Sequence, residues 1–259
     1  MPSFALGIEY DGSDYHGWQS QEELATIQGK LEQALSTIAD APIKVICAGR
    51  TDRGVHAVGQ VVNFSTEIAR PERAWLFGGN RYLPTDIGIQ WVKPVPDTFS
   101  ARFDALSRRY QYIIYNHTVR NALYATRMTW QCRPLNVEAM HIAAQFLVGE
   151  HDFQSYRAQS CQAKSSIREI YEISVQRRDN LVIIDIHANA FLHHMVRNIT
   201  GVLMRIGVNE QPPVWAKEVL LAKDRTIADV TAPPHGLYLM RVTYPEHYQF
   251  PISKGIITP

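Results

Sequence analysis

Cysteine is scarce in this chain of 259 residues, and the few cysteines resemble neither a disulfide framework nor a thiolate metal site. Cys47, Cys132 and Cys161 are an odd number, and no two of them form a C-x-x-C pair. The H-E-x-x-H signature of zinc hydrolases and the G-x-x-x-x-G-K phosphate loop are missing as well. We therefore expect a protein that works without a metal ion or a bound nucleotide cofactor.

An excess of charge of either sign is also missing, because 26 basic residues are balanced by 25 acidic ones, for a net charge of +1. Charge alone therefore does not indicate nucleic acid, and an RNA partner would require basic residues gathered on one face. No apolar run is long enough to cross a membrane, and the opening residues do not resemble a signal peptide. We expect a cytoplasmic protein that does not associate with membranes.

The first hundred residues contain alternating strand and helix patterns. Apolar side chains occupy every second position of residues 4–10, which is typical of a half-buried strand. Apolar residues recur at helical spacing over 27–38, and Thr26 before them suits a helix N-cap. The remaining segments of this half are strands at 45–48 and 61–64 and a proline-bearing stretch at 84–96.

The second half resembles the first in the order of its elements, so the sequence predicts an α+β fold of two similar halves, with mixed or antiparallel sheets flanked by helices. We place these halves at residues 1–104 and 105–245, followed by a tail, 246–259, that is either docked or partly disordered. The predicted elements of the second half are strands at 110–115, 170–175, 181–187 and 237–242, and helices at 136–148 and 193–206.

The densest polar segment is G-R-T-D-R-G-V-H-A at residues 49–57, between two apolar strand candidates. Loops at the ends of sheets commonly carry functional side chains. Asp52 lies between Arg50 and Arg53, and nearby cations favour the carboxylate form. By spacing alone, a salt-bridged turn residue is a commoner interpretation of Asp52 than a catalytic carboxylate, because structural ion pairs are frequent.

Six segments, in the same order along the chain, resemble the TruA-type pseudouridine synthases, and together they favour the catalytic interpretation. Two departures from that family's pattern are a looser G-G-N-R-Y-L-P stretch at 78–84 and Ser166, which stands where a proline is usual. The six matching segments are residues 10–19 (YDGSDYHGWQ), 26–29 (TIQG), 49–57 (GRTDRGVHA), 100–112 (SARFDALSRRYQY), 151–164 (HDFQSYRAQSCQAK) and 191–198 (FLHHMVRN).

The resemblance implies an enzyme that isomerises uridine to pseudouridine at positions 38, 39 and 40 of the tRNA anticodon stem-loop, without a cofactor or metal. It implies an active-site cleft between the two halves, with Asp52 from the first half and Tyr110 and Arg197 from the second. Asp52 would act on a nucleotide that has been flipped out of the stem. Covalent attack and proton abstraction that leads to a glycal both stay open.

By the same resemblance, Tyr110 stacks on the target base and Arg197 pairs with Asp52. From the residues alone, a core tyrosine on a strand is the slightly favoured interpretation of Tyr110. For Arg197, a surface residue whose stem lies on an apolar helix is as well supported as a partner of Asp52. Family members form homodimers and bind tRNA across both subunits, so we expect a homodimer here. The residues expected to contact the RNA substrate are Arg50, Arg53, His56, Arg157, Lys164 and Arg168.

Two other functions are compatible with parts of the pattern. An RNA-binding protein with a degenerate enzyme fold would be expected to have a damaged 50–52 motif or to lack Tyr110, and this chain has both features intact. A glycoside hydrolase with an aspartate nucleophile usually needs a second carboxylate, and none accompanies Asp52 in its motif.

Overall fold

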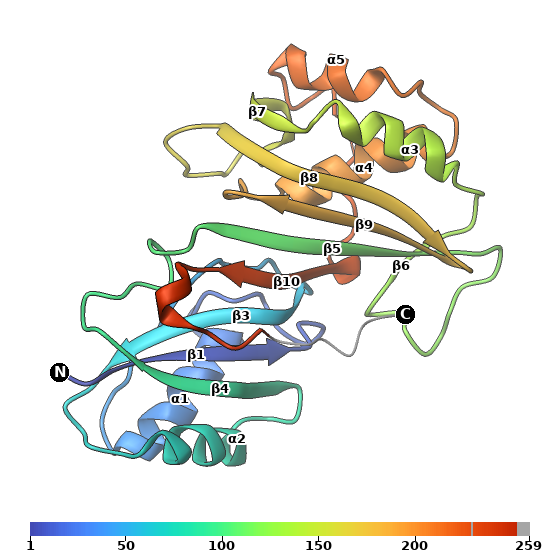
Figure 1. The fold of residues 1–259 in the computed structure, drawn as a ribbon. Coiled ribbons are helices and arrows are strands. Elements are labelled where there is room, and N and C mark those ends of the chain that lie inside the picture. The colour runs from blue at the N-terminus through green and yellow to red at the C-terminus, as the bar shows by residue number, and fades with distance from the viewer. Residues whose placement is uncertain (229, 253–259) are drawn as a thin grey trace. The chain divides into compact units, whose positions relative to one another are not determined.

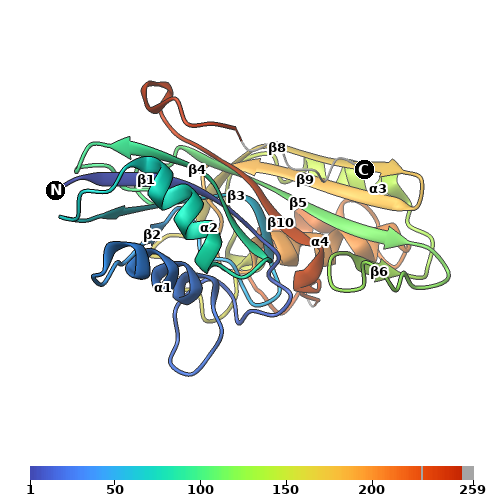
Figure 2. The ribbon, with the colours of Figure 1, turned by 90° about the horizontal axis from the view of Figure 1, so that it is seen from below.

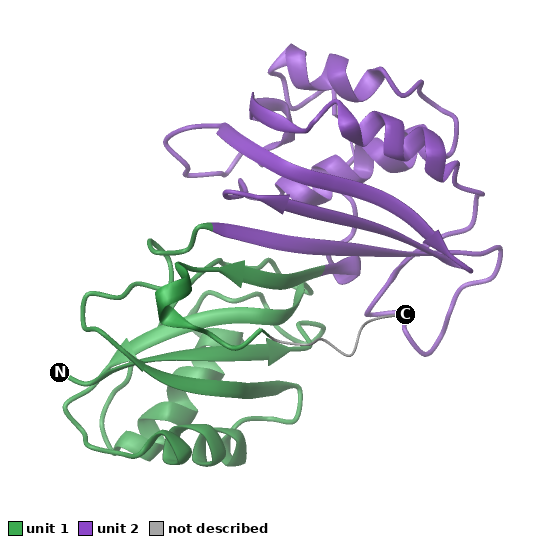
Figure 3. Cartoon of the chain, viewed as in Figure 1, with its two compact units in different colours: residues 1–106, 238–258 green, residues 107–237, 259 purple. Residues whose placement is uncertain are grey.

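The computed structural model describes residues 1–228 and 230–252, which form two compact units (Figure 3). Of the described residues, unit 1 contains Met1–Leu106 and 238–252, and unit 2 contains those of Ser107–Leu237. The sequence-based division assigned residues up to 245 to the second half, whereas in the structure the chain returns to unit 1 at Tyr238. Of the predicted tail, residues 253–259 lie outside the described part of the chain.

The sheet of unit 1 has the strand order β4-β1-β3-β10, and the short strand β2 also pairs with β3 (Figure 1). Strand β1 is antiparallel to both β4 and β3, whereas β10 runs parallel to β3 through the pairs Tyr238–His56 and Leu239–Ala57. The bounds of these strands are β1, Ser3–Tyr10; β2, Ile46–Cys47; β3, His56–Ser65; β4, Ile87–Val95; and β10, Leu237–Thr243.

The predicted strand at 4–10 is confirmed, but the prediction that it is half-buried is wrong. Seven of the eight residues of β1 are buried, since both faces of this part of the sheet are covered. The indole of Trp91 in β4 lies over Gly7, where a β-carbon would be 2.1 Å from the Trp91 Nε1 atom. Helices α1 (Ile27–Ala39) and α2 (Gly79–Tyr82) lie on one face of this sheet (Figures 1 and 2).

Helix α1 begins where the sequence indicates. The side chain of Thr26 accepts a hydrogen bond from the amide of Gly29, which satisfies one of the unpaired donors of the first turn. The apolar face buries Ile27, Leu31 and Leu35 against unit 1, and a left-handed Asp40 ends the helix. A π-helical turn, η1 (Ala74–Gly78), leads into α2.

The sheet of unit 2 has the order β5-β9-β8-β7, with antiparallel neighbours, and β6 pairs with β5 in parallel. The predicted strands at 170–175 and 181–187 are confirmed as β8 and β9, which form a hairpin with a turn in which Asp179 has a positive φ of 51°. The strand bounds are β5, Ser107–Asn116; β6, Thr129–Gln131; β7, Gly149–Asp152; β8, Ile167–Arg178; and β9, Leu181–Ala188.

Three α-helices cover the described part of unit 2. The sequence predicts α3 (Val137–Gln145) and α4 (Met195–Gly207) but not α5 (Trp215–Ala222). Helix α3 contacts β8 and α4, while α5 contacts α3 and α4. Each unit is thus a sheet covered by helices, as the predicted α+β fold requires. Within residues 1–228 and 230–252, no helix has the length and apolarity needed to span a bilayer.

Each unit also contains short 3-10 turns. They are short pieces at the ends of loops, which is the usual place for this conformation. Their bounds are η2, Gln154–Tyr156; η3, Pro234–Gly236; and η4, Glu246–Tyr248.

Candidate active site

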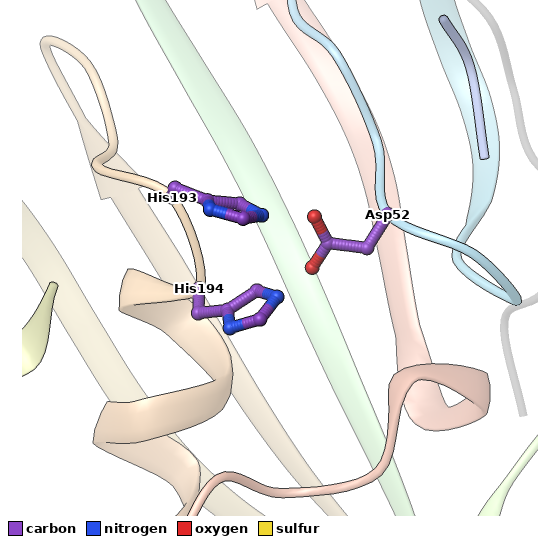
Figure 4. Close-up of side chains that lie close together, drawn as sticks. All are labelled: Asp52, His193 and His194. Carbon is purple, nitrogen blue, oxygen red and sulfur yellow. The ribbon is translucent and has the colours of Figure 1, made fainter. Parts of the chain in front are cut away.

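The segment that carries Asp52 is a tight loop between β2 and β3 in unit 1 (Figure 4). The amide of Val55 donates to the carbonyl of Asp52 over 3.1 Å, which closes a turn, and Gly54 adopts the positive φ of 75° that this turn requires. Thr51 is buried, Asp52 is half-buried, and Arg53 is exposed. The loop therefore presents the carboxyl side chain of Asp52 from a backbone that is fixed on both sides.

The segment at residues 10–19 holds this loop in place. The amide of Trp18 donates to the carbonyl of Thr51 over 3.0 Å, and the Tyr10 hydroxyl lies 2.8 Å from Thr51 Oγ1. A β-carbon on Gly17 would lie 2.7 Å from the Thr51 carbonyl oxygen, so only glycine allows this close approach. The segments 10–19 and 49–57, which each resemble the family, therefore pack against each other in the structure.

His56 is buried at the end of the Asp52 loop, where β3 begins. Its ring stacks on that of Tyr238 in β10, with 4.7 Å between the centroids. Its Nδ1 atom accepts from the amide of Gly12 at 3.1 Å and lies 3.1 Å from Asp11 Oδ1. These contacts are all with groups of unit 1, and they give His56 a structural role there.

The arginines beside Asp52 are exposed, and one of them influences a neighbouring thiol. Burial raises the pKa of Cys47 to about 11, although the positive charges of Arg50 and Arg102 act in the opposite direction. Cys47 is therefore a protonated thiol at neutral pH and not a nucleophile. Arg50 and Arg53 are exposed to solvent, as the predicted contact with RNA requires.

Tyr110 and Arg197, the other two predicted catalytic residues, both belong to unit 2. Tyr110 lies in β5 opposite Ile186 of β9, and its buried ring meets Phe191 edge-on at 5.0 Å between centroids. Arg197 lies in the first turn of α4, where its Nε donates to the carbonyl of Ala232 over 2.9 Å. The amide of Ala232 in turn donates to the Arg197 carbonyl, so a backbone segment fixes the base of this side chain.

Two histidines precede α4 (Figure 4). His194 has a left-handed φ of 61° at the N-cap position, and the rings of His193 and His194 lie 4.0 Å apart between centroids. The His193 carbonyl accepts from the amide of Ala158 over 2.9 Å. The start of α4 is thereby attached to the loop that carries Lys164.

Within that loop, the predicted RNA-binding cations differ in their surroundings. Arg157 donates to the Cys161 carbonyl over 2.8 Å, and Arg168 donates to the carbonyls of Ser165 and Ile167. Burial lowers the pKa of Arg168. Lys164 is exposed and Arg157 and Arg168 are half-buried, so the two arginines support the loop on which Lys164 is presented.

The end of this loop is held by a contact that the sequence analysis did not anticipate. The Ser166 hydroxyl donates to Asp152 Oδ1 over 2.5 Å, and Lys223 lies 3.1 Å from the other carboxylate oxygen. The hydrogen bond from Ser166, followed by those from Lys223 and the amide of Gln154, holds the pKa of Asp152 below its usual value. The only indication of this contact in the sequence is that Ser166 stands where the family usually has a proline.

Comparison with known proteins adds the following similarities. A family model described as tRNA pseudouridine synthase matches residues 7–104 and 143–245. A tRNA pseudouridine synthase A of Nitrosococcus oceani is 56% identical over 254 residues, which cover 98% of each chain. The protein of that name from Pseudoalteromonas atlantica is 56% identical over 250 residues, which cover 96% of this chain and 95% of the relative. That from Shigella boydii is 55% identical over 247 residues, which cover 95% and 92%.

Among solved structures, the likeness is weak. The crystal structure of the archaeal box H/ACA sRNP Nop10-Cbf5 complex aligns over 91% of this chain and 47% of the matched chain. The sequence identity is 11% and the TM-score is 0.35, which is too low to carry an argument.

Proposed function

The chain belongs to the tRNA pseudouridine synthase family and is an isomerase, and on that premise we propose that it converts uridine to pseudouridine at positions 38, 39 and 40 of the tRNA anticodon stem-loop. In this reaction the bond between ribose C1′ and N1 of the base breaks, the base rotates, and a bond from C1′ to C5 forms. N1 gains a proton and C5 loses one. Atoms and electrons balance without a redox partner or group donor, so we propose that no cofactor is used.

One observation carries this proposal: the 49–57 motif is intact and its loop is held rigidly, in a chain 56% identical to a tRNA pseudouridine synthase A over 98% of its length. In the proposed mechanism Asp52 acts on the flipped nucleotide, either by covalent attack at C1′ or by abstraction of a ribose proton. The fixed turn from Asp52 to Val55 supports either role, because a nucleophile or a base must be held within reach of its target.

Tyr110 is proposed to stack on the extruded base. A base in a stem must be unpaired and unstacked before an enzyme can reach it, which costs a few kcal/mol. Stacking on an aromatic ring contributes about 1–3 kcal/mol, which offsets much of that cost. The edge-on contact with Phe191 and the burial of Tyr110 in β5 support a fixed ring orientation, which a stacking platform needs.

Arg197 is proposed to pair with Asp52 and keep it ionised when the substrate excludes water. The Ala232 carbonyl already accepts from Arg197 Nε, which fixes the base of the guanidinium group. The cations Arg50, Arg53, Arg157, Lys164 and Arg168 are proposed to line the path of the RNA backbone. The buried His56, which the resemblance also places among the RNA-contact residues, is proposed instead to hold the Asp52 loop in place. We further propose a cytoplasmic homodimer, which rests on the family resemblance.

The proposal can be tested with tRNA transcripts labelled with tritium at C5 of uridine. Tritium leaves only when the new bond forms at C5, so its release measures the complete reaction. Transcripts that keep a single uridine at position 38, 39 or 40 assign the site. We expect release by the wild type, and none above background by Asp52→Ala. The matched control is Asp97→Ala, which removes an exposed carboxylate of the same unit and should keep full activity.

The outcomes separate the alternatives. Release by Asp52→Ala at the rate of the wild type would contradict the role of Asp52. Binding of tRNA by the wild type without release from any anticodon-arm uridine would favour a degenerate RNA-binding protein over the proposed enzyme. Release from another region of the tRNA would leave the reaction correct and the position wrong.

A further inference from the structure

We propose that Tyr10 is a positioning residue for Asp52 and that it acts through the side chain of Thr51. This inference rests on the proposed catalytic role of Asp52, and it names a group that does not itself touch the reacting atoms. Tyr10 is the last residue of β1, and Thr51 directly precedes Asp52 in the chain. A buried hydrogen bond links their side chains.

That hydrogen bond joins two side chains that are far apart in the sequence. The Tyr10 hydroxyl lies 2.8 Å from Thr51 Oγ1, and either oxygen can be the donor. Tyr10 is 3% exposed and Thr51 is 8% exposed, so water has little access to either group. A buried hydroxyl that loses its partner costs more than the bond itself contributes, because its desolvation is no longer compensated.

The strand is irregular where it presents Tyr10. Ile8 pairs with Gln60 and Tyr10 with Ala57, so the register between β1 and β3 shifts by one residue between them. Such bulges redirect a side chain, and they are frequent next to active sites. The ring of Tyr10 also contacts that of Trp18 at 5.9 Å between centroids, which fixes the direction of the hydroxyl.

The backbone of Thr51 is held from the opposite side. Its carbonyl accepts from the amide of Trp18 over 3.0 Å. The carbonyl of Trp18 accepts from the amide of Gln28, and that of Gly17 accepts from the amide of Ile27, so this segment is attached to the first turn of α1. Thr51 is therefore fixed at its carbonyl by Trp18 and at its side chain by Tyr10.

These two attachments restrict the position of Asp52. Both hinder rotation of the peptide that joins Thr51 to Asp52, and the hydrogen bond from the amide of Val55 restricts Asp52 at its own carbonyl. A misplacement of a catalytic group by 1 Å can lower the rate about 100-fold. Loss of the Tyr10 hydroxyl removes one attachment and leaves the other, so we expect a smaller effect.

The experiment compares three variants that each lose one or two hydroxyl groups: Tyr10→Phe, Thr51→Val and the double variant. We expect kcat for tritium release to fall about tenfold in each, while KM for tRNA stays within about twofold of the wild type because both hydroxyl groups are buried and do not themselves face the RNA. If the two residues act through one bond, the double variant falls no further than the single ones. Multiplied effects in the double variant would overturn the proposal.

The matched control is Tyr244→Phe. Tyr244 is buried in the same unit, and its hydroxyl donates to the Ala101 carbonyl over 2.6 Å, so this change also removes one buried hydrogen bond. We expect Tyr10→Phe and Tyr244→Phe to lower the melting temperature by similar amounts. Only Tyr10→Phe should lower kcat. An equal loss of kcat in both variants would show a general effect of stability and would overturn the positioning role.

A second measurement makes the inference independent of the reaction. Amide hydrogen exchange at Val55 reports on the turn that it forms with Asp52, and it should be faster in Tyr10→Phe than in the wild type or Tyr244→Phe. If the wild type releases no tritium, the proposed function fails, while faster exchange would still support the role of Tyr10 in holding the loop. Exchange and kcat that both match the wild type would overturn the inference.

Discussion

The Nδ1 atom of His56 lies 3.1 Å from the amide nitrogen of Gly12 and 3.1 Å from Asp11 Oδ1. One ring nitrogen cannot accept a hydrogen bond from an amide and donate one to a carboxylate in the same protonation state. The neutral ring with its proton on Nε2 accepts from Gly12, whereas a ring protonated at Nδ1 donates to Asp11. The tautomer of His56 therefore decides which of these two neighbouring residues its Nδ1 atom holds.

Substitutions of Tyr110 can distinguish the contribution of its aromatic ring from that of its hydroxyl group. Tyr110→Phe should keep base stacking and lose only the steps that need the hydroxyl, whereas Tyr110→Ala should lose both. Stacking of about 1–3 kcal/mol per base corresponds to a further 5- to 150-fold decrease in kcat/KM for tritium release, roughly, in the alanine variant. Equal activity of the two variants would argue against the stacking role.

The roles of some single residues could be predicted from the sequence, and those of others could not. Thr26 was predictable as an N-cap, because the signal for it lies within four residues of the helix it caps. The contact between Tyr10 and Thr51 was not predictable, since it joins residues 41 positions apart and depends on a strand bulge. The motif at 49–57 indicated Asp52 as a candidate catalytic residue, whereas only the structure shows which groups hold its loop in place.

At the scale of elements, β4 and α5 are two of those that the sequence did not predict, and for both the cause can be identified. Strand β4 falls in a stretch that ends with prolines, and Pro94 lies inside it. A proline is tolerated there because β4 pairs with β1 alone and is the edge strand of its unit. Helix α5 has eight residues and no side-chain hydrogen bond at its N-cap, so it has neither the length nor the capping signal that marks α1.

The loop before β8 is the element for which we predict a pH dependence. The pKa of Asp152 is lowered in the folded protein, chiefly by the Ser166 hydroxyl, so its contribution to stability is present above its ordinary pKa of 3.8 and is lost as the pH falls through the lowered value. Ser166→Ala should therefore destabilise the protein at pH 6 by at most about 1 kcal/mol, since the carboxylate is partly exposed.

Urea unfolding of the wild type and Ser166→Ala between pH 2 and pH 6 checks this prediction. The difference between the two proteins should be constant above pH 5 and should shrink below about pH 4, where Asp152 becomes protonated in both. Ser165→Ala is a suitable control, because it removes a neighbouring hydroxyl that bonds only the amide of Ile167 among the described contacts. A difference that is independent of pH would contradict the assignment to Asp152.

At the scale of the whole molecule, the sequence alone could not show which unit β10 belongs to. The pattern at 237–242 predicted the strand correctly, but nothing in it indicates a partner. In the structure this strand pairs with β3, and Gly59 of β3 lets it approach closely, since a β-carbon there would lie 2.4 Å from the Met240 carbonyl oxygen. Chain order suggested a division into two consecutive halves, whereas in the structure the chain returns to unit 1 at Tyr238.

The proposed homodimer is also a property of the whole molecule. Static light scattering at micromolar concentration should give about twice the chain mass of 29.5 kDa. A mass that falls toward one chain on dilution would still agree with a weak dimer. A single-chain mass at every concentration, in a preparation that releases tritium from tRNA, would show that the monomer is the active form.

The return of β10 to unit 1 also determines the order in which the protein can mature on the ribosome. Strand β3 and the Asp52 loop are synthesised early, yet the ring that stacks on His56 belongs to Tyr238 and is translated only after the whole of unit 2. Domains that are continuous in sequence can fold one after another during translation. Here the nascent chain must keep the edge of β3 unpaired on the β10 side until unit 2 has emerged, so the last step of folding completes the sheet beside the Asp52 loop.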